Sequence, residues 1–323
     1  MSTYKTINGG TIQSVASDPP ASYIGQVWYN STSGTLKFNA GPQVGTWATK
    51  ANMNFSRAYL GGCGTTTSAL GFGGEGKGPS PSARTGATEA YNGTAWTTES
   101  AIPSIIADLA GAGVSSTSGL TVGGSGPSGP LGGFTWNGSW TASPNLNTGR
   151  HALGGSGTVT AALAYGGFTS PTASETYNGS AWTNTPSLNT GGYRMGGAGP
   201  NTSAFAFGGN FSNNTEKYNG SAWTTAPTLN VARGQIAGAG TSNTSSLAMG
   251  GSEPPNRDTT ELFNGTAWVS QANMIIGKNG AGGAGIETLA LTFGGIPGPG
   301  TTPSFAGTEE FSMSGGVRTI TTS

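Results

Sequence analysis

The chain is poor in charge and has a single cysteine and a single histidine. Of its 323 residues, 13 are basic and 13 are acidic, so charged side chains make up only 8% and the formal net charge is zero. A chain without a basic excess neutralises few phosphates, which argues against nucleic-acid binding. One cysteine, Cys63, excludes an internal disulfide. With His151 as the only histidine, the chain has too few of these ligands for a zinc or copper site.

Long apolar runs are also missing. No stretch approaches the roughly 18 apolar residues that span a membrane. The sequence from Met1 to Gly10 lacks the apolar core of a signal peptide. We therefore expect no membrane insertion, and synthesis in the cytoplasm of the producing cell without an export signal. Glycine, proline and β-branched residues interrupt every long window, so the sequence predicts an all-β protein.

Glycine, in contrast, is abundant, with 59 residues, and it is accompanied by 8 Trp, 9 Tyr and 12 Phe. So many aromatic side chains are not typical of a flexible linker. An apolar run that ends in a glycine pair occurs six times, at intervals of about 42 to 50 residues. The pairs are Gly73-Gly74, Gly123-Gly124, Gly166-Gly167, Gly208-Gly209, Gly250-Gly251 and Gly294-Gly295.

A second signature, Glu-x-Tyr-Asn-Gly-x-Ala-Trp, follows most of the glycine pairs. Its aromatic residues are Tyr91 and Trp96, Tyr177 and Trp182, Tyr218 and Trp223, Phe263 and Trp268, with a shortened copy at Trp136 and Trp140. The Asn-Gly dipeptide predicts a tight hairpin turn with positive φ at both central residues. A glycine-rich strand begins the next repeat. Four short strands per repeat and this period predict a β-propeller.

The glycine pair followed by a separated tyrosine and tryptophan resembles the kelch repeat, over roughly residues 50 to 315. The resemblance implies a kelch-like propeller. The six repeats predict six four-stranded blades, with the segment around Trp47 completing the last blade and so closing the ring. A seventh, partial blade is the alternative, because Phe38 and Phe311 compete for one position. We predict a hairpin and attachment segment over residues 1–35 and the propeller over residues 36–323.

The N-terminal hairpin, Gly25-Gln-Val-Trp-Tyr-Asn30 and onward to Leu36, resembles hairpins in tail fibres and other virion proteins of tailed bacteriophages. Repeats of the form Tyr-Asn-Gly-Ser-Ala-Trp-Thr are similar to those of kelch-like phage virion proteins. The resemblance implies that the N-terminal segment binds other virion proteins. The propeller would then face outward on the tail or capsid surface, in several copies per particle.

The residues suggest no catalytic group, metal site or cofactor. Five glutamates recur at one repeat position: Glu89, Glu175, Glu216, Glu261 and Glu309. They could form a ring that binds a cation at the axis. The reading we favour is that they pair with Arg57, Arg150, Arg233 and Lys278 and tie blades together. The recurring tryptophans could likewise stack on sugars, but one per blade favours packing between blades.

Variable loops after the glycine pairs are the predicted binding surface, because binding residues concentrate on loops held by a rigid scaffold. The candidate ligand-facing residues are Lys77, Arg84, Phe168, Phe211, Arg257 and Phe305. These expectations together describe a non-enzymatic structural protein of a phage virion that attaches to a glycan or protein of the host surface. The alternative is a free, lectin-like propeller that binds glycans.

Overall fold

In this computed structural model the chain forms two compact units, Met1–Gly45 with Met313–Ser323, and Thr46–Ser312. We call them the terminal unit and the propeller unit. The described residues contain strands and turns but no helix. The structure describes residues 12–19, 26–39, 44–76, 83–126, 129–130, 132–252, 258–298, 304–313 and 317–319.

The terminal unit is one four-stranded sheet. Its strands, in spatial order, are β1 (Gln13–Val15), β2 (Val27–Asn30), β3 (Thr35–Asn39) and β32 (Val317–Thr319). The carboxylate of Asp18 accepts hydrogen bonds from Lys37 Nζ at 2.8 Å, Asn30 Nδ2 at 2.8 Å and Trp28 Nε1 at 3.1 Å. These donors, Lys37 first, lower the pKa of Asp18 to about 2. The ionised carboxylate therefore links β2 to β3 at neutral pH.

The boundary predicted after residue 35 lies instead after residue 45. Leu36 and Phe38 belong to β3, which pairs with β2 on one side and with β32 on the other. The C-terminal strand β32 thus belongs to the terminal unit and not to the propeller. An isolated two-stranded hairpin is only marginally stable, and pairing with strands from both ends of the chain gives this hairpin a complete sheet.

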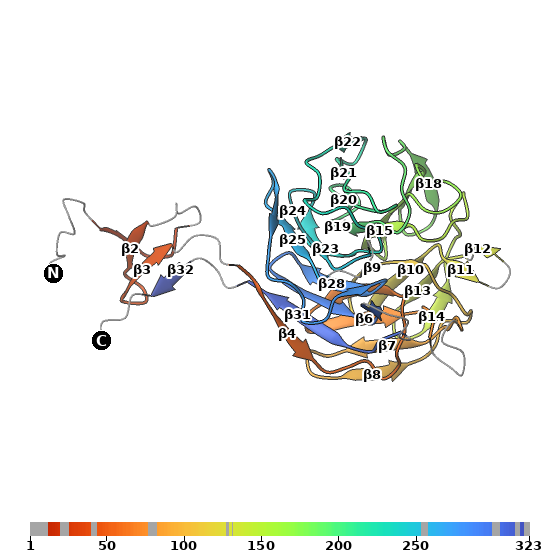
Figure 1. Ribbon diagram of the computed structural model, residues 1–323, viewed down its shortest axis with the longest axis horizontal. Coiled ribbons are helices and arrows are strands. Elements are labelled where there is room, and N and C mark those ends of the chain that lie inside the picture. Colours follow the sequence, from red (N-terminus) through yellow and green to blue (C-terminus); the bar gives the residue numbers. More distant parts are fainter. Residues whose placement is uncertain are drawn as a thin grey trace. The chain divides into compact units, whose positions relative to one another are not determined.

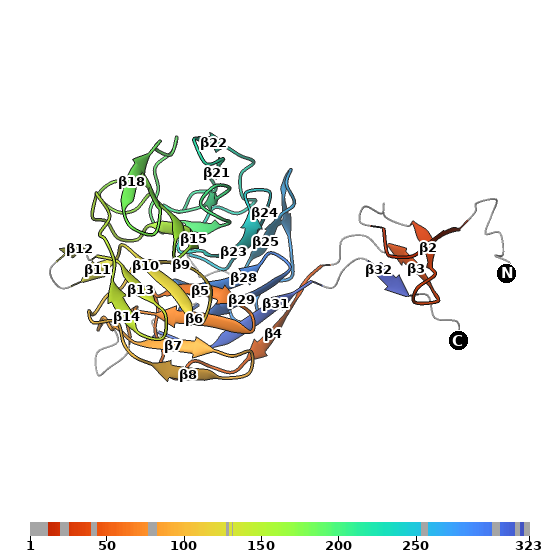
Figure 2. The same ribbon diagram turned by 180° about the vertical axis from the view of Figure 1, so that it is seen from behind.

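The propeller unit consists of six four-stranded sheets among the described residues, and these are the blades. Figures 1 and 2 show them around a common centre, each with its first strand innermost. Blade 1 contains β5 (Gly61–Thr65), β6 (Ser68–Phe72), β7 (Thr88–Tyr91) and β8 (Trp96–Glu99). Blade 2 contains β9 (Ala110–Ser115), β10 (Ser118–Val122), β13 (Phe134–Trp136) and β14 (Trp140–Ala142). Blade 3 contains β15 (Gly154–Thr158), β16 (Ala161–Tyr165), β17 (Ser174–Tyr177) and β18 (Trp182–Thr185).

Blades 4 to 6 follow the same order. Blade 4 contains β19 (Gly196–Ala198), β20 (Phe205–Phe207), β21 (Thr215–Tyr218) and β22 (Trp223–Thr225). Blade 5 contains β23 (Ala237–Ser242), β24 (Ser245–Met249), β25 (Thr260–Phe263) and β26 (Trp268–Ser270). Blade 6 contains β28 (Gly282–Ile286), β29 (Leu289–Phe293), β31 (Thr308–Ser312) and β4 (Thr46–Lys50). Two short pairs, β11 (Ser125–Gly126) with β12 (Gly129–Pro130) and β27 (Lys278–Asn279) with β30 (Ile296–Pro297), lie outside these sheets.

Blade 6 closes the ring, because its outer strand β4 comes from the N-terminal side of the propeller unit. β4 pairs with β31, and Trp47 lies opposite Phe311 with ring centroids 5.4 Å apart. Phe38 lies in the terminal unit and does not compete with Phe311. The all-β propeller prediction is confirmed, and of its two blade counts the described residues form six.

The second strand of each blade is buried on both faces, since neighbouring blades cover both sides of the sheet. β16 and β24 are almost entirely buried along their lengths. This double burial explains why these strands read as continuous apolar runs and not as an alternating pattern. The recurring tryptophans pack between blades in the same way. Trp96 donates through Nε1 to Thr308 Oγ1 of blade 6 at 3.0 Å, and Trp223 to Ser174 Oγ of blade 3 at 3.2 Å.

The Asn-Gly turns differ from the predicted geometry. Gly93 has a positive φ of 93°, but Asn92 does not have a positive φ. Instead, the Asn92 side chain accepts hydrogen bonds from the backbone N–H groups of Thr94 and Ala95, both at 2.9 Å. The same bonds recur at Asn178, Asn219 and Asn264. The loop between the paired Tyr91 and Trp96 is four residues long, which is too long for the predicted two-residue turn.

The glycine pairs connect neighbouring blades. The second glycine of each pair donates its N–H to a backbone carbonyl at the start of the next blade, over 2.7 to 3.1 Å. The first glycines have φ of 59–68° and the second 87–112°, values that other residues adopt only with strain. The donor and acceptor residues are Gly74 and Ile106, Gly124 and Arg150, Gly167 and Gly192, Gly209 and Arg233, Gly251 and Lys278, Gly295 and Arg57.

The predicted buried ion pairs are present, and each one joins a blade to the chain segment that arrives from the preceding blade. Arg57, in the connection between β4 of blade 6 and β5 of blade 1, places Nη2 3.0 Å from Oε1 of Glu89 on β7. The second carboxylate oxygen of Glu89 accepts the backbone N–H of Asn54, in the segment that arrives from blade 6, at 2.6 Å. Each glutamate therefore anchors an incoming connection. Equivalent pairs are Arg150 with Glu175, Arg233 with Glu261 and Lys278 with Glu309.

Substitution of a first-strand glycine should destabilise the propeller severely. A Cβ at Gly238 would lie 2.2 Å from the carbonyl oxygen of Gly197 in the preceding blade. We expect Gly238→Ala to lower the free energy of unfolding by about 3 kcal/mol or more, because backbone must move. Gly234→Ala is the matched control in the same blade, with no contact closer than 3.4 Å. It should cost less than about 1 kcal/mol. Equal losses in chemical denaturation of both variants would contradict this account.

Candidate functional site

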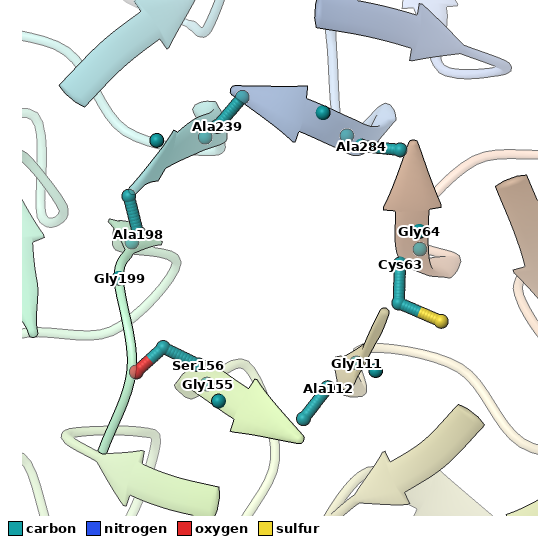
Figure 3. Close-up of a pocket in the computed structure, with 18 residues that line it drawn as sticks. Cys63, Gly64, Gly111, Ala112, Gly155, Ser156, Ala198, Gly199, Ala239 and Ala284 are labelled. Atoms are coloured by element: carbon teal, nitrogen blue, oxygen red, sulfur yellow. The ribbon is translucent and has the colours of Figure 1, made fainter. Parts of the chain in front are cut away.

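A channel runs along the propeller axis between the six first strands. Each strand contributes one Gly-x-Gly triplet to the wall of a cavity of about 130 Å³. Figure 3 shows that the middle residues are small and encircle an open centre. They are Cys63, Ala112, Ser156, Ala198, Ala239 and Ala284. The first strands can approach this closely because glycine has no Cβ. A Cβ at Gly111, for example, would lie only 2.5 Å from the Gly62 carbonyl oxygen.

One end of the channel is surrounded by a closed ring of backbone hydrogen bonds. Each of six equivalent residues donates its N–H to the carbonyl of the equivalent residue in the preceding blade, over 2.5 to 3.1 Å. All six have a left-handed backbone with φ of 52–59°. Five of them carry side chains, for which this conformation is strained, so the ring must hold them in place. We call this end the ring face, formed by Tyr59, Asp108, Ala152, Arg194, Gln235 and Gly280.

The ring face combines aromatic, acidic and basic side chains around a cavity of about 90 Å³. Arg194 Nη2 lies 3.8 Å from Asp108 Oδ1, and its guanidinium lies 5.2 Å from the centre of the Tyr59 ring. Burial raises the pKa of Tyr59, against the opposing charge of Arg194. Burial, and then the charge of Asp108, raise the pKa of Glu75. These shifts mark a partly desolvated cluster of charges, a feature typical of functional sites.

Sequence reasoning missed Tyr59, Asp108, Arg194 and Gln235 as a group. They are far apart in the chain, and each is an ordinary residue beside a glycine-rich strand. The signal that could have identified them is sequence variation among the repeats. This position holds six different residues, although the glycines that follow it hardly change. Such variation indicates that the side chain at this position does not pack between blades.

Two of the predicted ligand-facing residues lie beside this group. Phe168 is 52% exposed and forms an isolated bridge with His151, the residue directly before Ala152 of the ring. Its ring centroid lies 5.2 Å from that of His151 and 5.8 Å from that of Tyr193. Phe211 is 49% exposed, and the residue before it, Asn210, donates its N–H to the carbonyl of Tyr193, the residue before Arg194, at 3.2 Å. The structure thus gathers exposed aromatic side chains near the ring face.

The other predicted loop residues are placed differently. Arg84 is partly exposed, and its Nε lies 3.7 Å from Glu75 Oε1. Phe305 is only partly exposed, with Lys278 Nζ 5.8 Å from its ring centre. Lys77 and Arg257 lie outside the described residues.

The opposite end of the channel, which we call the wide mouth, opens into a larger cavity of about 580 Å³. It is lined by the hairpins between first and second strands, among them Thr65 to Thr67. Val114, Ile286 and Leu289 are 56%, 41% and 41% exposed there. This surface is mainly aliphatic and hydroxylic and holds no charged side chain among its lining residues.

The described residues contain no group of three or more His, Cys, Asp or Glu side chains that could hold a metal ion. Nor do they include a helix long and apolar enough to cross a membrane.

Comparison with known proteins places the fold. No known protein family matches the sequence, and no curated protein matches it. Among solved structures, the chain is similar to YjhT with a TM-score of 0.66 at 11% identity, covering 81% of this chain and 97% of that one. The chain folds as a β-propeller.

The match to YjhT overturns the prediction that the chain is not an enzyme. That prediction depended on composition, on the absence of familiar catalytic motifs and on the resemblance to virion proteins. Similarity to nearly the whole length of YjhT establishes the architecture, and one architecture hosts both binding and catalysis. The ring face also brings together carboxylate, phenol and guanidinium groups that are dispersed in the sequence. The non-enzymatic assignment is therefore withdrawn.

Cys63 should be chemically silent in the folded protein. Burial raises the pKa of its thiol to about 12, and its side chain is 5% exposed. A raised pKa lowers the thiolate fraction, and the thiolate is the reactive form. We expect iodoacetamide to leave native protein unmodified at about pH 8 and to alkylate it fully in denaturant, as measured by intact mass. Stoichiometric alkylation under native conditions would contradict the burial of Cys63.

Proposed function

We propose that this protein is a structural component of a bacteriophage virion, displayed on the tail or capsid surface, whose ring face attaches to the host surface. The resemblance of the hairpin and repeats to phage virion proteins supports the proposal that the protein is part of a virion. The composition of the ring face supports the proposal that this surface attaches to the host. There exposed aromatic residues, Phe168 among them, lie beside a charged cluster on a rigid scaffold.

The chemistry of the ring face suits a carbohydrate. Exposed phenyl rings offer flat apolar faces to the C–H face of a sugar. Arg194 and Gln235 carry several N–H donors, and Asp108 accepts hydrogen bonds, so hydroxyl groups can be recognised in both roles. A cavity of about 90 Å³ is too small for a whole oligosaccharide, so we propose that one sugar residue covers this end of the channel.

In this proposal the terminal unit and the propeller unit have different roles. It is a compact sheet built from both ends of the chain, and we assign to it the contacts with other virion proteins. Display in several copies would strengthen a weak carbohydrate contact through multivalency. The protein would be made in the host cytoplasm and assembled there into particles. Under the alternative, a free lectin-like propeller, the same ring face would bind glycans without a particle.

Binding to the ring face can be separated from folding by paired substitutions. We expect Arg194→Ala and Phe168→Ala each to weaken binding to host cells and to a glycan panel at least about tenfold, because each removes a proposed contact group, the partly exposed guanidinium of Arg194 or the exposed ring of Phe168. Val114→Ala, at the wide mouth, is the control and should bind as the wild type does. Thermal unfolding of all three variants checks that they fold. Unchanged binding by both ring-face variants would refute attachment through this surface.

The virion assignment has its own test. Antibody against the protein should label purified phage particles and co-sediment with them. Glycan binding by a protein that is absent from particles would instead establish the lectin-like alternative.

A further inference from the structure

Blade 4 departs from the ion-pair pattern of the propeller. Glu216 occupies the repeated glutamate position and is 2% exposed. In blades 1, 3, 5 and 6, the carbonyl of the partner cation accepts the N–H of the second glycine in the preceding glycine pair. In blade 4 the carbonyl that accepts this bond, from Gly167, belongs to Gly192, so Gly192 occupies the position of the partner cation. The equivalent cations are Arg57, Arg150, Arg233 and Lys278. Among the described residues, Glu216 forms no ion pair.

In blade 2 both members of the glutamate–cation pair are replaced. Ile106 stands at the cation position, and Phe134 stands at the glutamate position, opposite Thr121 of the second strand. Both charges are replaced together by apolar side chains that pack in one cluster. Blade 4, in contrast, keeps the carboxylate and loses only its partner. A buried carboxylate without a counter-charge is costly, so this arrangement needs an explanation.

The space near Glu216 is a small cavity with both polar and apolar lining residues, Met195 among them. Its lining residues include Glu216, Gly208 and Asn214, and its volume is about 10 Å³, which is room for one particle the size of water. Glu216 Oε1 accepts one hydrogen bond, from the N–H of Thr190 at 2.7 Å. Its Oε2 accepts the backbone and side-chain N–H groups of Asn189 at 2.8 and 2.9 Å.

The other blades show what the equivalent space binds. In blade 1, Arg57 Nη1 donates to the carbonyls of Gly73 and Ala87, and these correspond to Gly208 and Asn214, since each pair is joined by the same backbone hydrogen bond. In blade 6 an ammonium group occupies this space. Lys278 Nζ lies 3.2 Å from Glu309 Oε1 and 3.4 Å from the carbonyl oxygen of Gly307, the equivalent of Asn214.

We propose that the cavity of blade 4 binds a monovalent cation of the size of water, K⁺ or NH₄⁺, held by Glu216 and by the carbonyl oxygens of Gly208 and Asn214. Carbonyl oxygens replace the hydration shell of K⁺ in other proteins. A single carboxylate supplies the one negative charge that a monovalent ion requires. The bound ion would take the structural place that a guanidinium or ammonium group fills in blades 1, 3, 5 and 6.

Thermal unfolding of the full-length protein tests this proposal. At equal ionic strength, replacing choline by K⁺ or by NH₄⁺ should raise the Tm of the wild type by about 2–4 °C, since the ion binds only the folded state. The two salts are measured separately, which identifies the preferred ion. Choline is too large for a cavity of about 10 Å³, so it serves as the reference cation.

Three variants separate this site from a general salt effect. Glu216→Gln removes the charge but keeps an oxygen acceptor, and Gly192→Arg supplies the cation from the chain itself. The atoms nearest to an added Cβ at Gly192 belong to the Met195 side chain, with Sδ at 2.9 Å, so this flexible side chain must shift to admit the larger residue. Both variants should lose the K⁺ response. Gly192→Ala, the matched control, should keep it.

An equal salt response in all variants, or none in the wild type, would overturn the proposal. If Gly192→Arg fails to fold, Rb⁺ replaces it as the probe. Anomalous diffraction from Rb⁺-soaked crystals should show an ion in contact with Glu216 Oε1 in the wild type and none in Glu216→Gln. A wild-type crystal without that peak would refute the site.

Discussion

The close approach of the six first strands is the constraint on which the rest of this structure depends. Backbone lies directly against backbone around the axis, and a single Cβ at Gly111 or Gly238 would come within 2.5 Å of a carbonyl oxygen in the neighbouring blade. Two closed circuits of backbone hydrogen bonds, one through the glycine pairs and one through the ring face, then join every blade to the next. Because backbone atoms make these bonds, the circuits hold whatever side chains stand beside them.

That independence explains where the blades are free to differ. Positions that pack between blades, such as the tryptophans and second-strand residues, repeat closely because interiors have little spare volume. The ring-face position carries six different residues, since only its backbone takes part in the circuit. The cation position holds Arg, Lys, Ile or Gly, each with a different local solution. The blades therefore differ in their side chains at positions where only backbone atoms hold the propeller together. These differences give the propeller the asymmetric surface that a binding site requires.

The candidate site was only partly predictable. The prediction from the loops after the glycine pairs selected Phe168, which is exposed and lies beside the ring face, because loops on a rigid scaffold are exposed. Tyr59, Asp108 and Arg194 were not predicted, since their proximity depends on the curvature of the whole ring. The Asn-Gly turns were assigned the wrong backbone because the Asn92 side chain, and not its φ, closes a longer loop. The sequence did predict the partners of the buried ion pairs, because the glutamates and the cations each recur at one repeat position.

The sequence alone determined the repeat and the four strands of each blade, because these follow from local spacing and from glycines whose positive φ few other residues tolerate. It favoured six blades over seven, and the structure decided between them by placing Phe38 in the terminal unit. Only the tertiary structure decided three other features. It assigned β3 and β32 to the terminal unit, joined distant charged residues at the ring face, and left Glu216 beside a cavity. Each depends on which segments meet after the ring closes, and closure is a property of all six blades together.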